Sequence, residues 1–373
     1  MAVPLLDLKA QHATIRDEVL AAILPIVDEQ TFILGEPVER LERMVMALSQ
    51  TKHAIGCANG SDALLLALRA LNVEQGDVVV TTPFTFFATA GAVHNVGARP
   101  VFADIDPGTF NISPTAAAEV VARTPGVKAV IAVDLFGQMA ALDELTARLP
   151  AGTSIIEDAA QSIGARRRQH GAWVRAGEAV SIGTFSFFPS KNLGGYGDGG
   201  MIVTQDDTIA SRLRRLRTHG SVKTYYHEEV GYNSRLDSLQ AAVLAAKLPH
   251  LESWSAARRL NAEFYSKAFA DLDGVRVPVI EPQNESIYNQ YTLRVDRRDA
   301  LQQYLKEKGI GHAVYYPLPL HLQPCFAYLG YKEGDFPESE QAAREVISLP
   351  VYPELTASQR DEVVSTVRAF YGQ

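Results

Sequence analysis

Cysteine is scarce in this chain of 373 residues, and its scarcity excludes stabilisation by disulfide bonds or by a zinc site. Cys57 and Cys325 are the only cysteines. Two cysteines are too few for a disulfide framework, and no Cys or His pair has the spacing of a zinc site. Sparse cysteine fits a reducing compartment. We therefore expect a cytoplasmic protein with no metal, held together by its hydrophobic core.

An excess of positive charge is also missing. The chain has 35 Lys and Arg against 43 Asp and Glu, which gives a net charge of -8. Without an overall basic field, nothing attracts the phosphates of a nucleic acid or of an anionic membrane. Neither is therefore an expected partner, whereas one small anion held by a few local donors remains compatible with the composition.

Long uninterrupted apolar runs of the targeting kind are absent as well. At the N-terminus Asp7 and Lys9 break the short apolar runs, so no signal peptide is expected. The stretch 78–98 has no Lys, Arg, Asp or Glu and is long enough to cross a bilayer. However, it contains Pro83, four threonines and two glycines. A buried strand followed by a buried helix explains this composition better than a membrane span.

What the chain does have is an ordinary globular composition, with 47% hydrophobic and 21% charged residues, arranged as alternating strand and helix patterns. Continuous apolar strands between helices are typical of a parallel sheet covered on both faces. Strands are expected at His53–Cys57, Val78–Thr82, Pro100–Ala103, Val127–Val133, Ser154–Glu157, Val180–Phe188, Met201–Thr204, Tyr291–Val295 and His312–Tyr315. Helices are expected at Lys9–Glu29, Glu36–Ser49, Ser61–Leu71, Phe86–Val96, from Pro114 onward, at Leu236–Leu272 with a break at Pro249, and at Asp299–Lys308, Glu338–Ile347 and Ala357–Phe370.

The long helical stretch after Leu236 indicates a bridge between two domains. We expect a large domain over residues 1–248 and a small C-terminal α/β domain over residues 249–373.

The segment Asn59-Gly60-Ser61-Asp62 connects a predicted strand to a predicted helix. Backbone N–H groups at a helix N-terminus bind anions, and a glycine lets a phosphate come close. On its own, the segment fits an ordinary strand–turn–helix capped by Ser61 better than an anion site.

Aromatic residues and acids follow two other predicted strands. Phe84, Phe86 and Phe87 come after Val78–Thr82, where a ring could stack on a planar cofactor, although aromatic clusters are mostly core. Asp158 ends a buried strand, at the edge where open α/β sheets bind ligands. A buried carboxylate needs a partner, and a protonated ring nitrogen would supply one. A helix cap or a structural ion pair is the alternative.

The sharpest signal is Ser186-Phe-Phe-Pro-Ser-Lys191. A strand delivers Ser186, whose hydroxyl suits a phosphate, and Lys191 follows five residues later among aromatics. A lysine is ordinarily solvated, but this one follows an apolar run and precedes a glycine-rich loop. Desolvation lowers the pKa of a lysine, which frees the neutral amine to attack a carbonyl carbon.

The order of these motifs decides between the alternatives. An anion-binding turn, an aromatic, a strand-end aspartate and a buried lysine match the phosphate, ring face, ring nitrogen and aldehyde of pyridoxal phosphate.

At this point the chain resembles a known family, the DegT/DnrJ/EryC1/StrS family of pyridoxal-phosphate-dependent sugar-nucleotide aminotransferases, over about Leu5 to Tyr371. The segments that carry the resemblance are Asn59-Gly-Ser-Asp-Ala-Leu64, Glu157-Asp-Ala-Ala-Gln161, Ser186-Phe-Phe-Pro-Ser-Lys191, Gly197-Asp-Gly-Gly200 and Asn233-Ser-Arg-Leu-Asp237. The resemblance implies the fold-type-I, aspartate-aminotransferase-like architecture: a large domain with a mixed seven-stranded sheet and a small C-terminal α/β domain. It also implies a homodimer with shared active sites.

The resemblance also implies roles for single residues. Lys191 would bind pyridoxal phosphate covalently and move the proton during catalysis, and Asp158 would hold the ring N–H. The remaining cofactor contacts would be Gln161 to the ring hydroxyl, Phe86 on the ring face, Gly60, Ser61 and Ser186 on the phosphate, and Asn233 from the neighbouring subunit.

Substrate contacts are implied less directly. Arg235 has the geometry to clamp a carboxylate, and a salt bridge to Asp237 is its alternative. The segment from Gly311 to His321 also matches the family, which makes His312, Tyr315, Tyr316 and His321 candidates, although close relatives often have His in place of Tyr315. Arg235 and His312 together would favour a uronic acid substrate.

The resulting expectation is transfer of the amine of L-glutamate to the 3-keto group of a nucleotide-linked hexose, through the pyridoxamine form of the cofactor. The loop after Lys191 resembles the 3-keto branch, and we expect a UDP-2-acetamido sugar or its uronic acid. A dTDP-linked 3-keto or 4-keto 6-deoxyhexose is the alternative substrate.

Three other functions compete with this expectation. A dehydratase on the same scaffold would have histidine in place of Lys191. A cysteine desulfurase would need a nucleophile such as Cys325. A non-catalytic, cofactor-binding regulator would keep all the contacts and lack turnover.

Overall fold

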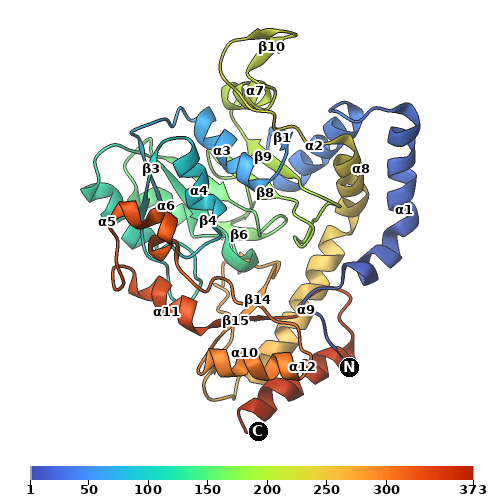
Figure 1. The fold of residues 1–373 in the computed structure, drawn as a ribbon, viewed down its shortest axis with the longest axis vertical. Coiled ribbons are helices and arrows are strands. Elements are labelled where there is room, and N and C mark those ends of the chain that lie inside the picture. Colours follow the sequence, from blue (N-terminus) through green and yellow to red (C-terminus); the bar gives the residue numbers. More distant parts are fainter. Residues whose placement is uncertain (1, 373) are drawn as a thin grey trace.

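The structure is a computed structural model that describes residues 2–372, and a sheet of seven strands lies at its centre, with helices on both faces (Figure 1). The strands stand in the order β1-β9-β8-β5-β4-β2-β3, and only β9 runs antiparallel to its neighbours. Their bounds are β1 His53–Cys57, β9 Gly200–Thr204, β8 Ile182–Ser186, β5 Ser154–Asp158, β4 Val127–Val133, β2 Val78–Thr81 and β3 Arg99–Phe102. The expected mixed seven-stranded sheet is confirmed.

The strands are buried on both faces because successive side chains enter two different cores. In β2, Val78 and Val80 join the core on one face, whereas Val79 joins the core on the other. Helices α2 (Glu36–Ser49), α5 (Pro114–Arg123), α6 (Leu142–Arg148) and α8 (Ser238–Lys247) cover the first face, and α3 (Gly60–Ala70), α4 (Ala88–Asn95) and α7 (Asp207–Leu216) cover the second. This arrangement explains the continuous apolar runs in the sequence.

The small domain has a three-stranded antiparallel sheet of its own, in the order β12-β14-β15. Helix α9 runs down from the large domain into it (Figure 1). Its Leu251 belongs to the core on the first face of the large sheet, and its Phe269 belongs to a third core, which lies in the small domain. The N-terminal Val3 belongs to this third core and pairs with Ile310. The bounds are β12 Val275–Arg276, β14 Tyr291–Val295, β15 Val346–Leu349, α9 Leu251–Phe269, α10 Arg298–Glu307, α11 Pro337–Glu345 and α12 Ala357–Phe370.

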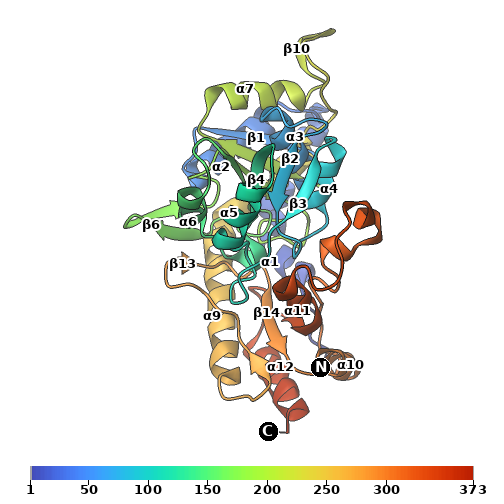
Figure 2. The same ribbon diagram turned by 90° about the vertical axis from the view of Figure 1, so that its left-hand side faces the viewer.

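The remaining elements are additions around these two domains. Helix α1 (Leu8–Glu29) packs on α8 through Ile15 and Val19. A small sheet, seen in Figure 2 at the side of the large domain, joins β6 (Arg166–Gln169), β7 (Ala172–Arg175) and β13 (Asn284–Glu285). The hairpin of β10 (Ser221–Lys223) and β11 (Tyr226–His227) projects from the molecule at the top of Figure 1.

Two expected elements were wrong. The segment His312–Tyr315 is not a strand, because only Ala313 forms a single bridge, to Ser348. The helix expected to reach Ile347 ends at Glu345, since Val346–Leu349 pairs with β14 as a strand. The charge-free stretch 78–98 contains β2 and α4. Within residues 2–372, no helix is long and apolar enough to cross a membrane, and no cluster of three metal-ligating side chains is found there.

Candidate active site

A cavity of about 580 Å³ opens at the edge where β2, β4, β5 and β8 end. Nine of the residues expected in the site line it. They are Gly60, Ser61, Phe86, Asp158, Gln161, Ser186, Lys191, Tyr315 and Tyr316. The large domain supplies the first seven, and the small domain supplies the two tyrosines together with Gln290.

The anion-binding end of the cavity brings the start of α3 against the end of β8. A Cβ added to Gly60 would lie 2.7 Å from Ser186 Cβ, so only glycine permits this approach. Asn59 caps the helix by accepting the Asp62 N–H at 2.8 Å. The N–H groups of Gly60 and Ser61 and the Ser186 hydroxyl remain as donors for a phosphate.

The buried carboxyl of Asp158 is held from two sides. Thr89 Oγ1 donates to Oδ2 at 2.8 Å, and the Ala160 N–H donates to Oδ1 at 3.3 Å. Burial raises the pKa of Asp158, whereas these donors and the charge of Lys191 lower it. The arrangement fixes one carboxylate in a water-poor site, which suits a cationic N–H such as that of a pyridinium ring.

Lys191 is the candidate nucleophile. Its backbone N–H closes a turn on the Phe188 carbonyl at 2.8 Å, which aims the side chain into the cavity. Burial lowers the pKa of Lys191 to about 8, against the opposing charge of Asp158. A lysine with this pKa has far more neutral amine at neutral pH than a solvated lysine has, so it can attack an aldehyde.

Gln161 and Tyr316 form a directed pair of polar groups. The Phe136 N–H donates to Gln161 Oε1 at 2.7 Å, so Gln161 Nε2 faces Tyr316 and donates to its hydroxyl at 3.2 Å. The Tyr316 hydroxyl therefore has its own proton available for another acceptor in the cavity. Burial raises the pKa of Tyr316, which keeps that proton in place. The ring of Phe86 lies 6.2 Å from that of Tyr316, with the Phe86 side chain 57% exposed.

Four expected site residues lie outside this chain's own cavity. Asn233 is exposed and pairs through its backbone with Thr218. His312 bonds the Ile310 carbonyl at 2.8 Å. Arg235 is half-buried, and within residues 2–372 it makes no salt bridge to Asp237.

His321 is the clearest correction. Its buried ring contacts Phe336 at 4.7 Å between centroids, and Nε2 meets Glu340 Oε1 at 3.1 Å. The histidine thus packs within the C-terminal segment and does not line the cavity.

Some residues of the site are not predicted from the sequence. In the sequence Thr89 is one of four threonines in a charge-free stretch. Its contact with Asp158 joins α4 to β5 across 69 positions. Gln290 and Asp198 also line the cavity. No local pattern indicates such long-range contacts.

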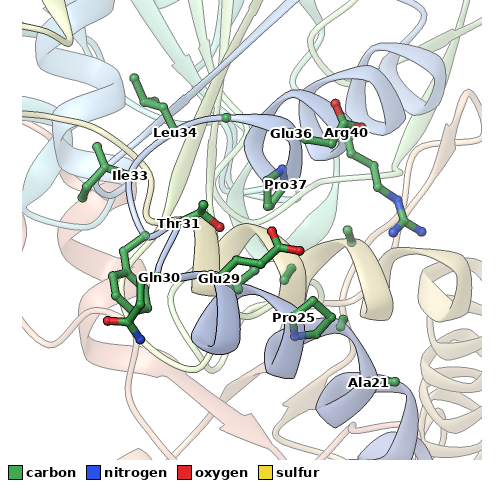
Figure 3. A pocket seen from close by; sticks show the side chains of 16 residues that line it. Ala21, Pro25, Glu29, Gln30, Thr31, Ile33, Leu34, Glu36, Pro37 and Arg40 are labelled. Atoms are coloured by element: carbon green, nitrogen blue, oxygen red, sulfur yellow. The ribbon is translucent and has the colours of Figure 1, made fainter.

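A larger hollow of about 770 Å³ lies between the end of α1 and the start of α2 (Figure 3). Pro25, Ile33, Leu34 and Pro37 line it, with charged groups such as Arg40 at the border. It has no lysine nucleophile, so the chemistry belongs to the smaller cavity.

Residues 13–368 match the DegT/DnrJ/EryC1/StrS aminotransferase family. The chain belongs to this family. A solved structure, S. venezuelae DesV in complex with a ketimine intermediate, superposes with a TM-score of 0.95 and 40% identity, covering 100% of this chain and 99% of that one. The family's fold and its aminotransferase activity therefore apply to this chain.

Three relatives of this chain have different names. The chain is 49% identical to a "Pleiotropic regulatory protein" of Geobacillus stearothermophilus, covering 100% of this chain and 99% of the relative. It is 43% identical to a UDP-N-acetyl-3-dehydro-alpha-D-glucosamine 3-aminotransferase of Acidithiobacillus ferrooxidans, covering 98% and 97%. It is 42% identical to a UDP-2-acetamido-2-deoxy-3-oxo-D-glucuronate aminotransferase of Pseudomonas aeruginosa, covering 95% and 96%.

The cofactor of this family is pyridoxal phosphate, and the cavity fits it. The glycine cradle of Gly60, the fixed carboxylate of Asp158 and the desolvated amine of Lys191 suit its phosphate, ring nitrogen and aldehyde. When bound, the cofactor draws electrons from the carbon that carries the amine. A dehydratase would have histidine in place of Lys191, so this residue argues against a dehydratase. Cys325 is exposed and does not line the cavity, which argues against a desulfurase.

Proposed function

We propose that the chain transfers the amine of L-glutamate to the 3-keto carbon of a UDP-linked 2-acetamido hexose or its uronic acid. The observation that carries the reaction is the half-buried Lys191, with its lowered pKa, beside a carboxylate that is already fixed. The names of the Acidithiobacillus and Pseudomonas relatives support the choice of sugar and of carbon 3.

In this proposal each residue has one task. Lys191 Nζ would bind the cofactor and would move the proton between the amine-bearing carbon and the cofactor. Asp158 would hold the N–H of the cofactor ring. Gln161 would orient the ring by contacting the hydroxyl group of that ring. Phe86 covers one face of the ring. The N-terminus of α3 and Ser186 hold the phosphate.

Tyr315 and Tyr316 border the substrate side of the cavity. The Tyr316 hydroxyl, which accepts from Gln161, donates to the substrate. Among residues 2–372, the lining of the cavity contains no arginine, and its one lysine, Lys191, is assigned to the cofactor, so the carboxylate of glutamate or of a uronic acid needs another cation. We assign that role to Arg235, whose guanidinium binds carboxylates with two parallel hydrogen bonds.

Arg235 and Asn233 reach a cavity only if that cavity belongs to a second copy, so we propose a homodimer with shared sites. Exposed apolar side chains support an interface near the hollow of Figure 3. Ile33, which lines this hollow, is 56% exposed, and Leu24 of α1 is 54% exposed. Both cysteines are free, which supports a cytoplasmic location.

A panel of sugar nucleotides tests the substrate. The purified protein is incubated with glutamate and UDP- or dTDP-linked 3-keto and 4-keto sugars, and products are identified by mass spectrometry. The expected product is the amine of the UDP-linked 2-acetamido-3-keto hexose or uronate. Product from 4-keto-6-deoxy sugars alone would contradict amination at carbon 3 and leave the aminotransferase activity intact.

A second candidate function, regulation without turnover, is favoured by one observation. The relative that shares 49% identity is named a regulatory protein. A regulator would bind the cofactor on Lys191 and turn over none of the sugars in the panel.

A further inference from the structure

Two more acids lie behind Asp158, at the ends of neighbouring strands. Asp134 follows β4, and Glu157 precedes Asp158 on β5. The side chains of Asp134 and Glu157 are both 0% exposed. The two strands are parallel and in register here, and the Asp134 N–H donates to the Asp158 carbonyl at 3.0 Å. The three acids therefore form one buried cluster.

Asp134 has the surroundings of an ionised carboxylate. Its Oδ1 accepts the Ala140 N–H at 2.8 Å, and its Oδ2 accepts the Ser162 hydroxyl at 2.7 Å. Two donors on a carboxyl group favour its charged form.

Glu157 has the surroundings of a protonated acid. Its Oε2 accepts the Gly177 N–H at 2.7 Å, whereas its Oε1 receives no donor from the protein. The register of β4 and β5 puts Asp134 and Glu157 on the same face of the sheet, and each of the two groups affects the pKa of the other. Within residues 2–372, neither acid forms a salt bridge with Lys, Arg or His. Two facing carboxyl groups without a cation cannot both ionise in a dry site.

We propose that Glu157 carries a proton that it donates to Asp134, so that the pair presents a single negative charge behind Asp158. Asp134 and Glu157 are then positioning residues that act through Asp158. Their shared charge helps Asp158 to keep the proton on the cofactor's ring nitrogen, since an added negative charge nearby favours a cationic N–H. This role rests on the proposed contact between Asp158 and the ring.

The electrostatics agree with the geometry. Burial raises the pKa of Glu157 well above its usual range, and the charge of Asp134 raises it further. Burial also raises the pKa of Asp134 to about 6, although the donors from Ser162 and Ala140 oppose that rise. Beyond the pair, the charged groups nearby are Asp158 and, next to it, Lys191. Near neutral pH the pair therefore holds one proton, on Glu157.

The first test is infrared spectroscopy of the protein without cofactor, at a pH near 7.5. The C=O band of a protonated carboxylic acid should be present in the native protein. It should disappear in Glu157→Gln, whose amide donates to Asp134 in the same way. The exposed Glu144→Gln serves as the control and should keep the band. Absence of the band from the native protein, or its persistence in Glu157→Gln, would overturn the shared proton.

The second test is nitrogen NMR of cofactor labelled at the ring nitrogen. Asp134→Asn removes the charge, so the pH at which the ring N–H is lost should fall by about one unit, whereas Glu157→Gln should leave it in place. An unchanged titration in a folded Asp134→Asn protein would overturn the role through Asp158. A native ring nitrogen without a proton would overturn the Asp158 contact itself, while the infrared result would still decide the shared proton. The infrared test needs only Glu157→Gln, so it decides even if Asp134→Asn does not fold.

Discussion

The chemistry of the site depends on the environment of single residues. Lys191 is a common residue type, and its reactivity comes from burial, which lowers its pKa to about 8. Asp158 gives the opposite case, because burial raises its pKa while Thr89 and Lys191 hold it down. The charge of Lys191 favours the anionic form of Asp158, which suits the N–H of the ring. The charge of Asp158 in turn raises the pKa of Lys191, but burial outweighs this effect and keeps part of the amine neutral.

The pKa of Lys191 predicts how the protein without cofactor takes up pyridoxal phosphate. The protonated amine does not attack an aldehyde and the neutral amine does. The rate of covalent uptake should therefore rise with pH and level off above about 8. Stopped-flow absorbance in the near-visible measures this rate. Lys191→Ala is the control and should give no adduct after borohydride reduction. A rate that still climbs towards pH 10, where a solvated lysine titrates, would contradict the desolvated amine.

Secondary-structure elements are joined by a few buried polar contacts, and the ion pair of Glu42 and Arg217 is one of them. The two side chains meet at 2.6 Å and are 11% and 10% exposed. Both also bond to Gly56 of β1, through its N–H at 2.8 Å and its carbonyl at 2.9 Å. The contact fastens α2, β1 and the end of α7 to one another.

Removal of one partner from this pair should be costly. Glu42→Ala leaves the Arg217 charge buried without an opposite charge and the Gly56 N–H without its acceptor, and we expect a loss of about 3–5 kcal/mol in the free energy of unfolding. Glu36→Ala is the matched control. It removes a pair of the same length, 2.6 Å, with side chains that are 70% and 57% exposed, and it should cost less than about 1 kcal/mol. Urea denaturation measures both. Equal losses in the two variants would contradict the importance of burial here.

The sequence predicts elements well where local chemistry determines them. The helix expected from Pro114 onward is α5, which Ser113 caps by accepting the Ala116 N–H at 3.3 Å, and the apolar run Val127–Val133 is a central strand. The sequence does not predict features that depend on contacts between distant segments of the chain. The arginine run in β6 resembles a solvated segment, yet Arg167 is buried because Asp143, Glu144 and Glu281 surround it.

The same division holds in the site. The lysine, the aspartate and the glycine turn are visible as motifs, because each follows directly from a strand. Thr89 and the pair of Asp134 and Glu157 are not visible in this way, since only the folded sheet brings them to Asp158.

At the scale of the whole molecule, the cavity needs both domains. The small domain closes it with Gln290, Tyr315 and Tyr316, while the large domain provides every candidate cofactor contact. Asn233 lies outside the cavity of its own chain. A site completed by a second copy accounts for this position of Asn233, and it makes the dimer the proposed functional unit.

Subunit mixing tests the shared site. Lys191→Ala and Asn233→Ala should each be inactive, and a mixture that exchanges subunits should regain up to about a quarter of native activity, because half of the dimers then carry one intact site of two. A mixture of Lys191→Ala with Asp158→Ala is the control and should regain nothing, since both residues belong to the same chain's cavity. Recovery in neither mixture despite proven exchange, or in both, would contradict the shared site.

Transfer of ¹⁵N from labelled glutamate to the sugar tests the assignment most directly. The protein is mixed with ¹⁵N-glutamate and the UDP-linked 2-acetamido-3-keto hexose, and the product is analysed by NMR and mass spectrometry. The account predicts many turnovers per protein, 2-oxoglutarate as co-product and the label on carbon 3, all abolished in Lys191→Ala. Cofactor bound on Lys191 with no label in any sugar of the panel would contradict the account and identify a binding protein without transaminase activity.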